Sequence, residues 1–560
     1  MTDAAAASER SDGCQLADCA LAILVGGAAF LAVVGPKVLI VTNMLWLAAI
    51  GDSYTHYLGW EFFRHSPWSW PPGLNPNYGL EVSSSIIFSD SVPLVALPLK
   101  LFSAWMPSVF QYTGWWILLC FMLQAYFAAR IASLFSRDVV VKLGFAALLV
   151  LSPPMLWRLS VHFSLIAHWI ILAAIYLFFL PAGRRRWLAW TVLLGIAAFV
   201  HTYFLAMCGL LWIADLLRQR RGAGSPPWPA ELVVALGVVA AALWIGGFFP
   251  LRPAMLSSGY GIYRLNLLSL INPDGGQRDE HWLWSAILPT LPHDTGDYEG
   301  FNYLGAGGLA AVVLALPLLW IKRADYARAR LWPLFLAAVV FTLFAISPNI
   351  TIFDRTIQLP VPQLVFELAS SLRSSGRFFW PVFYLLLVGA TWLLHRAFGR
   401  SATGPILLAL AAFQIYDTYP GWSALRANFE HEGSRFPSSL TDPQLDAMAS
   451  HYNAIRALPA GTSLRDWDQI ADFALRNDLP TDAAYLARSD DARYTSEAIA
   501  AIAKHQFDPG SLYFLDDNLA RAVKNSMAAD DEMFRSGDFY VFAPGWRLLG
   551  IPTTLPIARP

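Results

Sequence analysis

Long apolar runs separated by short polar segments make up most of the chain. The runs are near the ~20 residues that a helix needs to cross a bilayer. We therefore predict a polytopic α-helical membrane protein with about 11 transmembrane helices. The predicted spans are 18–35, 113–135, 139–155, 164–182, 186–200, 202–218, 229–248, 303–321, 331–346, 378–396 and 403–419.

One apolar segment, 91–107, is short and is interrupted by Pro93, Pro98 and Lys100. If it lies along the membrane interface, the basic clusters at 184–186, 218–221, 322–330 and 396–400 all fall on the side of the N-terminus. Cytoplasmic loops carry an excess of Lys and Arg. We therefore expect a multi-pass protein of a bacterial inner membrane with a cytoplasmic N-terminus, and a first apolar run that is retained as a helix.

The pattern changes after about residue 420, where amphipathic stretches alternate with short β-like runs such as AAYLA, SLYFLD and DFYVFAP. This part holds 19 of the 40 acidic residues but only 13 of the 39 basic ones. We predict a transmembrane domain over 1–419 and a soluble periplasmic α/β domain over 420–560. The predicted topology places the large first loop, 36–91, and the loop 249–302 on the same outer face.

Composition supports this division and excludes several classes. The chain is 56% hydrophobic and 14% charged, whereas soluble domains carry about 25% charged residues. Its four cysteines form no disulfide framework and no CxxC pair, and no HExxH or similar zinc-ligand spacing occurs. There is also no glycine-rich phosphate loop and no basic patch for nucleic acid.

The first outer loop gathers ionisable groups between two acids. Asp52 lies where the chain leaves the membrane, and His56 follows four residues later, on the same face if the segment is helical. Asp52 is a candidate general base and Asp90 a second acid that orients the acceptor or binds a divalent cation. For Asp52 the role of a helix cap is an equally good interpretation, and for Asp90 alone the cap is somewhat favoured. Glu61 and His56 are candidates for substrate binding, and buried polar structure is the other interpretation of Glu61.

Basic side chains lie at the outer ends of later spans. Arg158 and His162 are four residues apart, and His201 lies in a predicted tight hairpin. Such groups are candidates for holding a phosphate, with snorkelling to lipid headgroups as the alternative. Arg373 and Arg377 precede a span on the outer side, against the charge rule, which favours a phosphate or carboxylate ligand.

The loop 249–302 offers hydrogen-bonding and aromatic groups suited to a carbohydrate. The candidates for substrate binding there are Tyr263, Asn266, Asn272 and Glu299, in addition to His162 from the preceding part of the chain. For any one of them, packing of an ordered loop over the helices is an equally good explanation. A transporter would place polar groups along the middle of the spans, whereas here they gather at one surface, which favours an enzyme.

Several strings carry a resemblance: GDSYTHYLGWEFFR, SIIFSDSVPL, NLLSLINP, EGFNYLG and RSSGRFFWP. With the many spans, the acid-led first loop and the soluble C-terminal domain, the chain resembles the GT-C superfamily of polyprenyl-phosphate-sugar-dependent glycosyltransferases. The strings also resemble a bacterial membrane-protein family placed near that superfamily. The resemblance covers most of the chain and implies a GT-C-like fold.

The resemblance implies a function and roles for individual residues. The protein would transfer a sugar from a polyprenyl-phosphate donor to a cell-envelope glycan or lipid, and the transfer would invert the configuration at the anomeric carbon, as in most members of the superfamily. Asp52 would deprotonate the acceptor hydroxyl, and Arg373 or Arg377, with Arg158 or His201, would hold the phosphate.

Some expectations stay open at this stage. No DxD or WWD-type signature occurs, which leaves metal dependence and protein glycosylation undecided. The sequence identifies no cofactor, and a divalent cation at Asp52 and Asp90 is compatible with it. A flippase or transporter, a ligase or polymerase of lipid-linked glycans, and a non-catalytic envelope assembly protein are the alternative functions.

Overall fold

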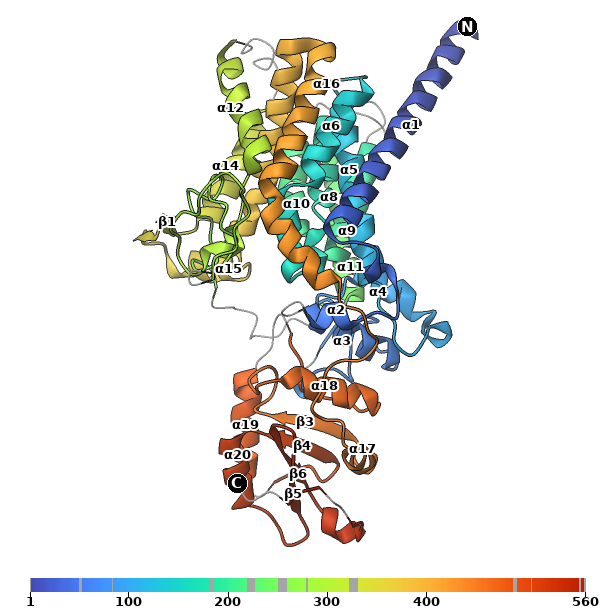
Figure 1. The fold of residues 1–560 in the computed structure, drawn as a ribbon, viewed down its shortest axis with the longest axis vertical. Helices are drawn as coiled ribbons and strands as arrows, with labels where there is room; N and C mark the ends of the chain where they lie inside the picture. The colour runs from blue at the N-terminus through green and yellow to red at the C-terminus, as the bar shows by residue number, and fades with distance from the viewer. Residues whose placement is uncertain are drawn as a thin grey trace. The chain divides into compact units, whose positions relative to one another are not determined.

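A computed structural model describes most of the chain (Figure 1). The residues outside the description are 1, 50–52, 83, 181–184, 219–226, 250–258, 278–279, 322–330, 487–490, 505, 553–554 and 558–560, together with the side chains of 2–15, 82, 491–492 and 503. The chain forms two compact units. Unit 1 comprises 1–40, 112–242 and 256–431, and unit 2 comprises 41–111, 243–255 and 432–560.

Unit 1 is built mainly from apolar helices (Figure 1). Its α-helices are α1 (Thr2–Val33), α5 (Thr113–Ala132), α6 (Val139–Val150), α7 (Pro153–Trp157), α8 (Trp169–Phe179), α9 (Arg186–Val200), α10 (Thr202–Arg218), α11 (Trp228–Ile245), α12 (Gly305–Ile321), α14 (Trp332–Ile346), α15 (Gln363–Ser370) and α16 (Trp380–Phe429). Short 3-10 helices join them: η1 (Lys37–Leu39), η5 (Arg158–Ser160), η6 (Phe163–Ile166), η8 (Asp297–Gly300) and η9 (Ser375–Phe379).

The protein is a multi-pass membrane protein. Among the described residues, four helices are long and apolar enough to cross a bilayer, and a fifth span results if the bent pair 139–150 and 153–160 is counted. Each predicted span overlaps helical structure, with 139–155 and 164–182 each covering two helices, and the count of about 11 membrane-crossing helices stays a prediction. The two spans predicted at 378–396 and 403–419 lie within α16, on either side of a kink at Gly399, whose φ of 71° interrupts the helical backbone.

Small residues allow the helices of unit 1 to approach one another closely. A Cβ atom at Gly26 of α1 would lie 2.5 Å from the carbonyl oxygen of Phe121 in α5. A Cβ atom at Gly307 of α12 would lie 2.2 Å from the carbonyl oxygen of Leu410 in α16. Helix pairs in membranes associate through such close backbone contacts because the lipid gives no hydrophobic driving force between them.

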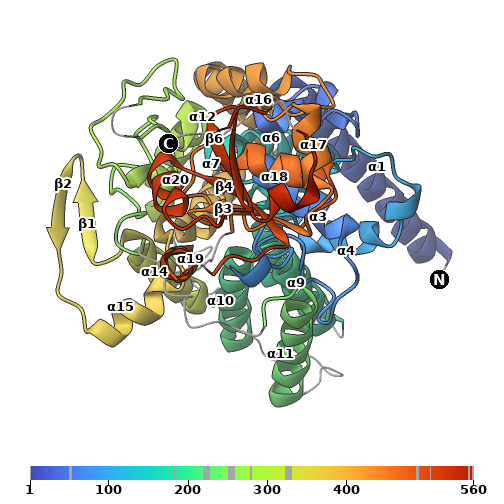
Figure 2. The ribbon, with the colours of Figure 1, turned by 90° about the horizontal axis from the view of Figure 1, so that it is seen from below.

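Polar segments link the helices at one end. The connection from 259 to 301 precedes α12 and carries η8. A two-stranded antiparallel hairpin of β1 (Asn349–Ile352) and β2 (Arg355–Gln358) follows α14. Figure 2 shows this hairpin and α15 at the outer edge of unit 1. The isolated bridge between Asn266 and Thr351 joins the hairpin to the 259–301 connection.

Unit 2 contains a four-stranded mixed sheet in the order β3-β4-β6-β5. Strands β3 (Ala454–Leu458) and β4 (Ser511–Leu515) are parallel, and β6 (Phe539–Ala543) is antiparallel to β4 and to β5 (Glu532–Ser536). Side chains of β4 alternate between the faces. Tyr513 and Leu515 join the apolar core on one face, and Phe514 contacts Phe473 on the other at 5.5 Å between ring centres.

Helices cover both faces of this sheet. They are α17 (Pro443–Ala449), α18 (Trp467–Arg476), α19 (Asp491–Ala503), α20 (Asp517–Lys524) and η10 (Trp546–Leu549). Two of them begin at aspartate caps: Asp442 accepts from the Gln444 N–H at 2.9 Å and Asp516 from the Leu519 N–H at 2.7 Å. Caps of this kind satisfy backbone donors that the first turn leaves without partners. The predicted mixed α/β character is confirmed.

The segment 41–111, which contains most of the predicted first outer loop, belongs to the same unit as the C-terminal region. It forms α2 (Leu45–Ala48), α3 (Tyr54–His65), η3 (Leu80–Val82), α4 (Pro93–Lys100) and η4 (Ser103–Trp105). The hydroxyl of Tyr54 donates to Asp472 of α18 at 2.8 Å, and Tyr78 forms a parallel bridge with Thr481. The segment 91–107 folds as α4 and η4, and its position along the membrane interface stays a prediction.

Candidate functional site

Two arginines share one buried carboxylate in unit 1. Arg158 of η5 donates from Nη1 to Glu299 Oε2 at 2.8 Å and from Nη2 to the Glu299 carbonyl oxygen at 3.1 Å. Arg377 of η9 donates from Nε to Oε2 at 2.9 Å and from Nη2 to Oε1 at 2.8 Å. We call these three residues the Glu299 cluster. The structure thus brings together three residues that the sequence analysis singled out in separate segments.

Positive charge exceeds negative charge in the Glu299 cluster. Burial alone would raise the pKa of Glu299, but Arg377, Arg158 and, more weakly, His162 hold that pKa well below its usual range. The carboxylate is therefore ionised and faces two guanidinium groups that are each at most 5% exposed. In addition, Nε of Arg158 is buried without a hydrogen-bond partner among the described residues. A buried donor without an acceptor is costly, and an anionic ligand would satisfy it.

Aromatic rings surround the cluster. The guanidinium of Arg158 lies 4.3 Å from the ring centre of Trp157 and 5.0 Å from that of Trp380. Arg377 lies 5.0 Å from the ring centre of Tyr203. Cation–π contacts of this kind stabilise arginine with little water present. They also hold the planar guanidinium groups in one orientation.

His201 connects to the cluster through Tyr203. Its Nδ1 accepts from the Tyr203 N–H at 3.1 Å, at the start of α10, and the Tyr203 hydroxyl accepts from the Ser374 N–H at 2.8 Å. Arg373 stacks its guanidinium 5.3 Å from the ring centre of Tyr263. The phosphate-binding candidates therefore lie on connected segments, but only Arg158 and Arg377 contact Glu299.

Two predicted substrate-binding asparagines hold the loop together. Asn266 donates to Asp297 and to the Phe353 carbonyl oxygen, both at 2.8 Å. Asn272 accepts from the N–H groups of Asp274 at 3.2 Å and Leu291 at 3.0 Å. These contacts support the alternative that the sequence analysis gave for them, that of an ordered loop.

The candidates from the first loop lie in unit 2. Asp52 lies outside the described residues, so its role stays a prediction. His56 contacts Asp90 through Nδ1, 2.9 Å from the carbonyl oxygen and 3.8 Å from Oδ2. Glu61 pairs with Arg64 at 3.2 Å and His65 at 3.5 Å. These pairs support the interpretation of Glu61 as buried polar structure.

The backbone at Asp90 is unusual. Asp90 has φ of 57°, and Val92, two residues later, has φ of 46°. Positive φ is tolerated by aspartate but is strained for a β-branched residue. Strain of this kind gathers at functional positions, which keeps Asp90 a candidate.

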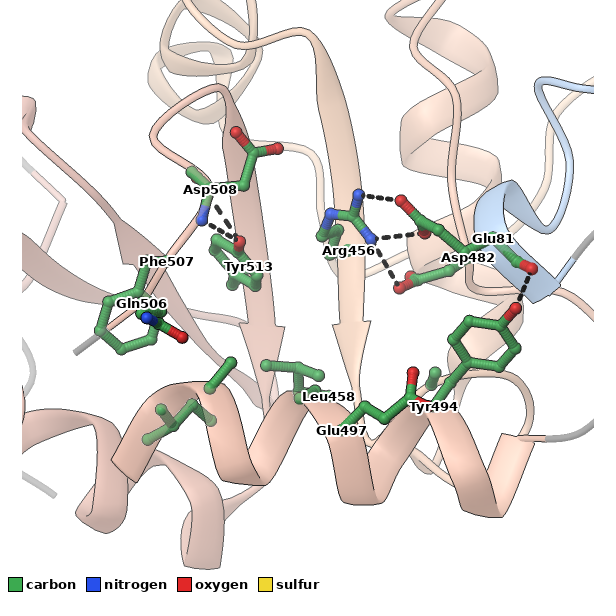
Figure 3. Close-up of a pocket in the computed structure, with 14 residues that line it drawn as sticks. Glu81, Arg456, Leu458, Asp482, Tyr494, Glu497, Gln506, Phe507, Asp508 and Tyr513 are labelled. Carbon is green, nitrogen blue, oxygen red and sulfur yellow. Dashed lines mark hydrogen bonds and ion pairs between the residues drawn. The ribbon is translucent and has the colours of Figure 1, made fainter. Parts of the chain in front are cut away.

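Unit 2 also contains a pocket that the sequence analysis did not anticipate (Figure 3). Its volume is about 300 Å³, and its charged wall is formed by Glu81, Arg456 and Asp482. Arg456 donates to both oxygens of Glu81, at 2.9 and 2.7 Å, and lies 3.8 Å from Asp482. Figure 3 shows the Tyr494 hydroxyl directed at Glu81, where it donates to the carbonyl oxygen.

The electrostatics of this pocket depend on burial. Burial raises the pKa of Asp482 to about 7, opposed by the hydrogen bond from the Ala457 N–H and by the charge of Arg456. Glu81 is half-exposed, and its hydrogen bonds from Arg456 lower its pKa. The pocket therefore changes charge near neutral pH. In the sequence, the only signal for this pocket was Glu81, a charged residue in a loop otherwise rich in aromatic and small residues.

A third group comes from the 259–301 connection. Asp274, His281 and His293 each offer one ligand atom, and these atoms lie within 4.8 Å of one another. The sequence carries no signal for this group, because the spacings of seven residues from Asp274 to His281 and twelve from His281 to His293 match no compact metal motif.

The fold and site define a multi-pass membrane protein with a C-terminal mixed α/β region. The chain belongs to the family described as a domain of unknown function (DUF6311), whose model matches residues 23–419, and the model of the DUF6311 C-terminal domain matches residues 444–544. No curated protein matches the sequence.

Solved structures similar to this chain include one oligosaccharyltransferase. It is the archaeal AglB from Archaeoglobus fulgidus, in complex with an inhibitory peptide and a dolichol-phosphate. The TM-score is 0.40 at 10% sequence identity, over 96% of this chain and 75% of that chain.

Proposed function

We propose that this protein is a membrane glycosyltransferase that takes its sugar from a polyprenyl-phosphate-linked donor and modifies a cell-envelope glycan or lipid. The observation that carries the proposal is the Glu299 cluster, in which two buried arginines share a single carboxylate. A cluster with this excess of positive charge at the polar end of a helical membrane unit is suited to a lipid phosphate. The planar, fork-shaped donors of arginine match phosphate oxygens better than lysine does.

The reaction requires stabilisation of a leaving group. An acceptor hydroxyl oxygen attacks the anomeric carbon, the bond from that carbon to the phosphate oxygen breaks, and polyprenyl phosphate leaves with the bonding electrons. Arg158 and Arg377 would stabilise the negative charge that grows on this phosphate. Tyr298 and Tyr263, which are half-buried with ring centres 5.9 Å apart, offer faces on which a sugar ring could stack.

The proton of the acceptor hydroxyl requires a base. Asp52 is the residue we assign to this role, on the sequence argument alone. We also propose that the transfer takes place on the periplasmic side of the membrane. The sugar, the acceptor and the linkage are to be identified by glycan analysis. The contacts of the Glu299 cluster support the leaving-group half of the reaction, and the base half rests on the assignment of Asp52.

A binding experiment tests the donor class. The full chain in detergent would be titrated with a polyprenyl phosphate and, separately, with the matching polyprenol, and the rise in melting temperature measured. We expect stabilisation by the phosphate alone. Arg377→Lys keeps the charge but loses the paired donors, so the affinity should fall about tenfold or more. Arg400→Lys, an exposed position, is the matched control and should leave it unchanged.

A cellular experiment tests the transfer itself. A deletion strain would be complemented with the wild type, Asp52→Asn or Arg377→Lys at equal membrane levels, and its envelope glycan analysed. We expect one sugar to be missing without the protein and with Asp52→Asn. Equal binding of polyprenol and polyprenyl phosphate would refute the donor class, whereas a normal glycan with Asp52→Asn would remove only the base.

A further inference from the structure

A short hairpin places two of three potential ligands within the 259–301 connection. Asp274 bridges to Leu283, and Gln277 bridges to Glu280, both antiparallel. The Gly275 N–H donates to the Trp282 carbonyl oxygen at 2.9 Å, which closes the ladder beside them. This pairing brings Asp274 and His281 together: Asp274 Oδ2 lies 2.5 Å from His281 Nδ1.

Backbone N–H groups bind one carboxylate oxygen of Asp274, and the other carboxylate oxygen faces the two histidines. Its Oδ1 accepts from the N–H groups of Gly276 and Trp282, each at 3.0 Å. Oδ2 faces His281 and His293, with His293 Nε2 3.4 Å away. A carboxylate oriented by backbone donors in this way resembles the supporting hydrogen bonds around metal ligands.

His293 presents a buried ring nitrogen to the same point. Its side chain is only 4% exposed. Nδ1 lies 3.1 Å from the Asp294 carbonyl oxygen, so this nitrogen carries the hydrogen and donates. Nε2 is buried and faces Asp274 Oδ2 at 3.4 Å, so that once this nitrogen loses its proton the lone pair points toward the same oxygen. A histidine whose other nitrogen donates to a backbone carbonyl is in the usual state of a metal ligand.

Asn272 holds the two ligand-bearing segments in register. It accepts from the Asp274 N–H at 3.2 Å and the Leu291 N–H at 3.0 Å, and donates to the Leu291 carbonyl oxygen at 3.1 Å. One side chain therefore ties the hairpin to the segment that leads to His293. The positions of the ligands are set by the fold before any ion binds.

We propose that Asp274, His281 and His293 form a binding site for a divalent transition metal ion, and that zinc is the ion it takes. Two imidazoles and one carboxylate are a ligand set for zinc with an open fourth position. His281, with a side chain 62% exposed, lies on the solvent side, where water or a substrate group completes the coordination. The inference is independent of the proposed transferase activity, and it departs from the sequence expectation that no zinc-ligand spacing is present.

The distances fit this ion with a small adjustment. Ligand atoms about 2.0–2.1 Å from a tetrahedral zinc lie about 3.3–3.4 Å apart. The 3.4 Å between Asp274 Oδ2 and His293 Nε2 meets this value. The Asp274–His281 contact must lengthen by about 1 Å, which the exposed His281 side chain can do by rotation. Magnesium and calcium prefer oxygen ligands and should not compete.

Direct metal analysis tests the proposal. The full chain, purified in detergent with a histidine-free tag and stripped with a chelator, would be titrated with Zn²⁺, Co²⁺ and Mg²⁺. We expect one zinc per chain by mass spectrometry, a visible cobalt absorption typical of tetrahedral ligation, and no binding of magnesium. His281→Ala should weaken zinc binding at least as much as the loss of a supporting hydrogen bond, about 10–100-fold.

The controls separate the site from misfolding. Because His281 is exposed, its substitution leaves the core intact and decides the question even if His293→Ala or Asp274→Asn fails to fold. His431→Ala replaces another exposed histidine of unit 1 and should bind zinc as the wild type does. A wild-type chain that takes up no stoichiometric zinc, or equal affinities in wild type and His281→Ala, would overturn the assignment.

Discussion

Glu81 and Arg456 form a two-pronged ion pair, with N–O distances of 2.7 and 2.9 Å, although 375 positions separate them in the chain. Glu81 comes from the first outer loop and Arg456 from the first strand of the four-stranded sheet. The loop is therefore part of the fold of unit 2 rather than a separate covering of the helical unit. Four predictions about this unit and unit 1 follow from particular contacts.

The first prediction concerns the strength of the Glu81–Arg456 pair. The side chains are 54% and 21% exposed, so water weakens the attraction. We expect a coupling energy of about 0.5–1 kcal/mol in a double-mutant cycle with Glu81→Ala and Arg456→Ala. Chemical unfolding of the full chain in detergent measures it. Arg493 and Glu497, an exposed pair within α19, form a control cycle expected to give about 0.3–0.5 kcal/mol. Strictly additive effects for Glu81 and Arg456 would contradict the pair.

The second prediction is a pH dependence that originates at Asp482. Its pKa is about 7 in the folded protein and about 3.9 in the unfolded chain. Between these values the folded protein holds a proton that the unfolded chain has released. The free energy of unfolding should therefore fall as pH rises from about 4 to about 7, by an amount on the order of a few kcal/mol.

Thermal unfolding from about pH 5 to about pH 8 checks this dependence. Asp482→Asn cannot titrate, and it keeps an oxygen that accepts from the Ala457 N–H, so it should lose the slope and remain folded. Glu81→Gln should shift the slope to lower pH, because the charge of Glu81 raises the pKa of Asp482. An Asp482→Asn protein with an unchanged slope would assign the effect to another group.

The third prediction concerns the carboxylate shared by Arg158 and Arg377. Glu299→Gln leaves two buried guanidinium groups without their counter-charge, so we expect a loss of about 3–5 kcal/mol in the free energy of unfolding. Added inorganic phosphate should restore part of this stability in the variant. Glu367→Gln, at an exposed glutamate of α15, should change stability by less than about 0.5 kcal/mol. Equal stabilities of the two variants would contradict the role of Glu299 as the counter-charge of Arg158 and Arg377.

Much of the fold could be predicted from the sequence. The ranges chosen from apolar length overlap helices, because in an apolar environment a helix pairs its backbone groups within the segment. The runs SLYFLD and DFYVFAP correspond to β4 and β6. Strand β3 was missed because its residues, AIRAL, continue an amphipathic stretch. The run AAYLA forms no strand over its described residues, 483–486.

The site was predicted less completely, for a physical reason. The cost of charge at membrane depth pointed to Arg158, the positive-inside rule pointed to Arg377, and Glu299 was noted as a hydrogen-bonding group of the 249–302 loop. Their partners depend on contacts between segments about 80 to 140 positions apart, which periodicity does not encode. The ion pair between Glu81 and Arg456 and the approach of Asp274 to His293 also depend on how loops fold, which periodicity does not encode.

The fourth prediction tests the hairpin through a glycine. A Cβ atom at Gly276 would lie 1.6 Å from the Glu280 carbonyl oxygen, so Gly276→Ala must open the hairpin. We expect a lower melting temperature and loss of zinc binding. Gly389→Ala, in α16 with nothing within 4 Å of the new atom, should be neutral or stabilise by up to about 1 kcal/mol. Retained zinc affinity in Gly276→Ala would show that the ligands do not need the hairpin.

Trp157 lies between the hairpin and the Glu299 cluster. Its Nε1 donates to the Gly275 carbonyl oxygen at 2.8 Å, and its ring packs against the guanidinium of Arg158. An ion that tightens the hairpin and an anion that orders Arg158 would therefore both act on the indole of Trp157. Binding linkage is reciprocal: if zinc raises the affinity for a phosphate by some factor, the phosphate must raise the affinity for zinc by the same factor.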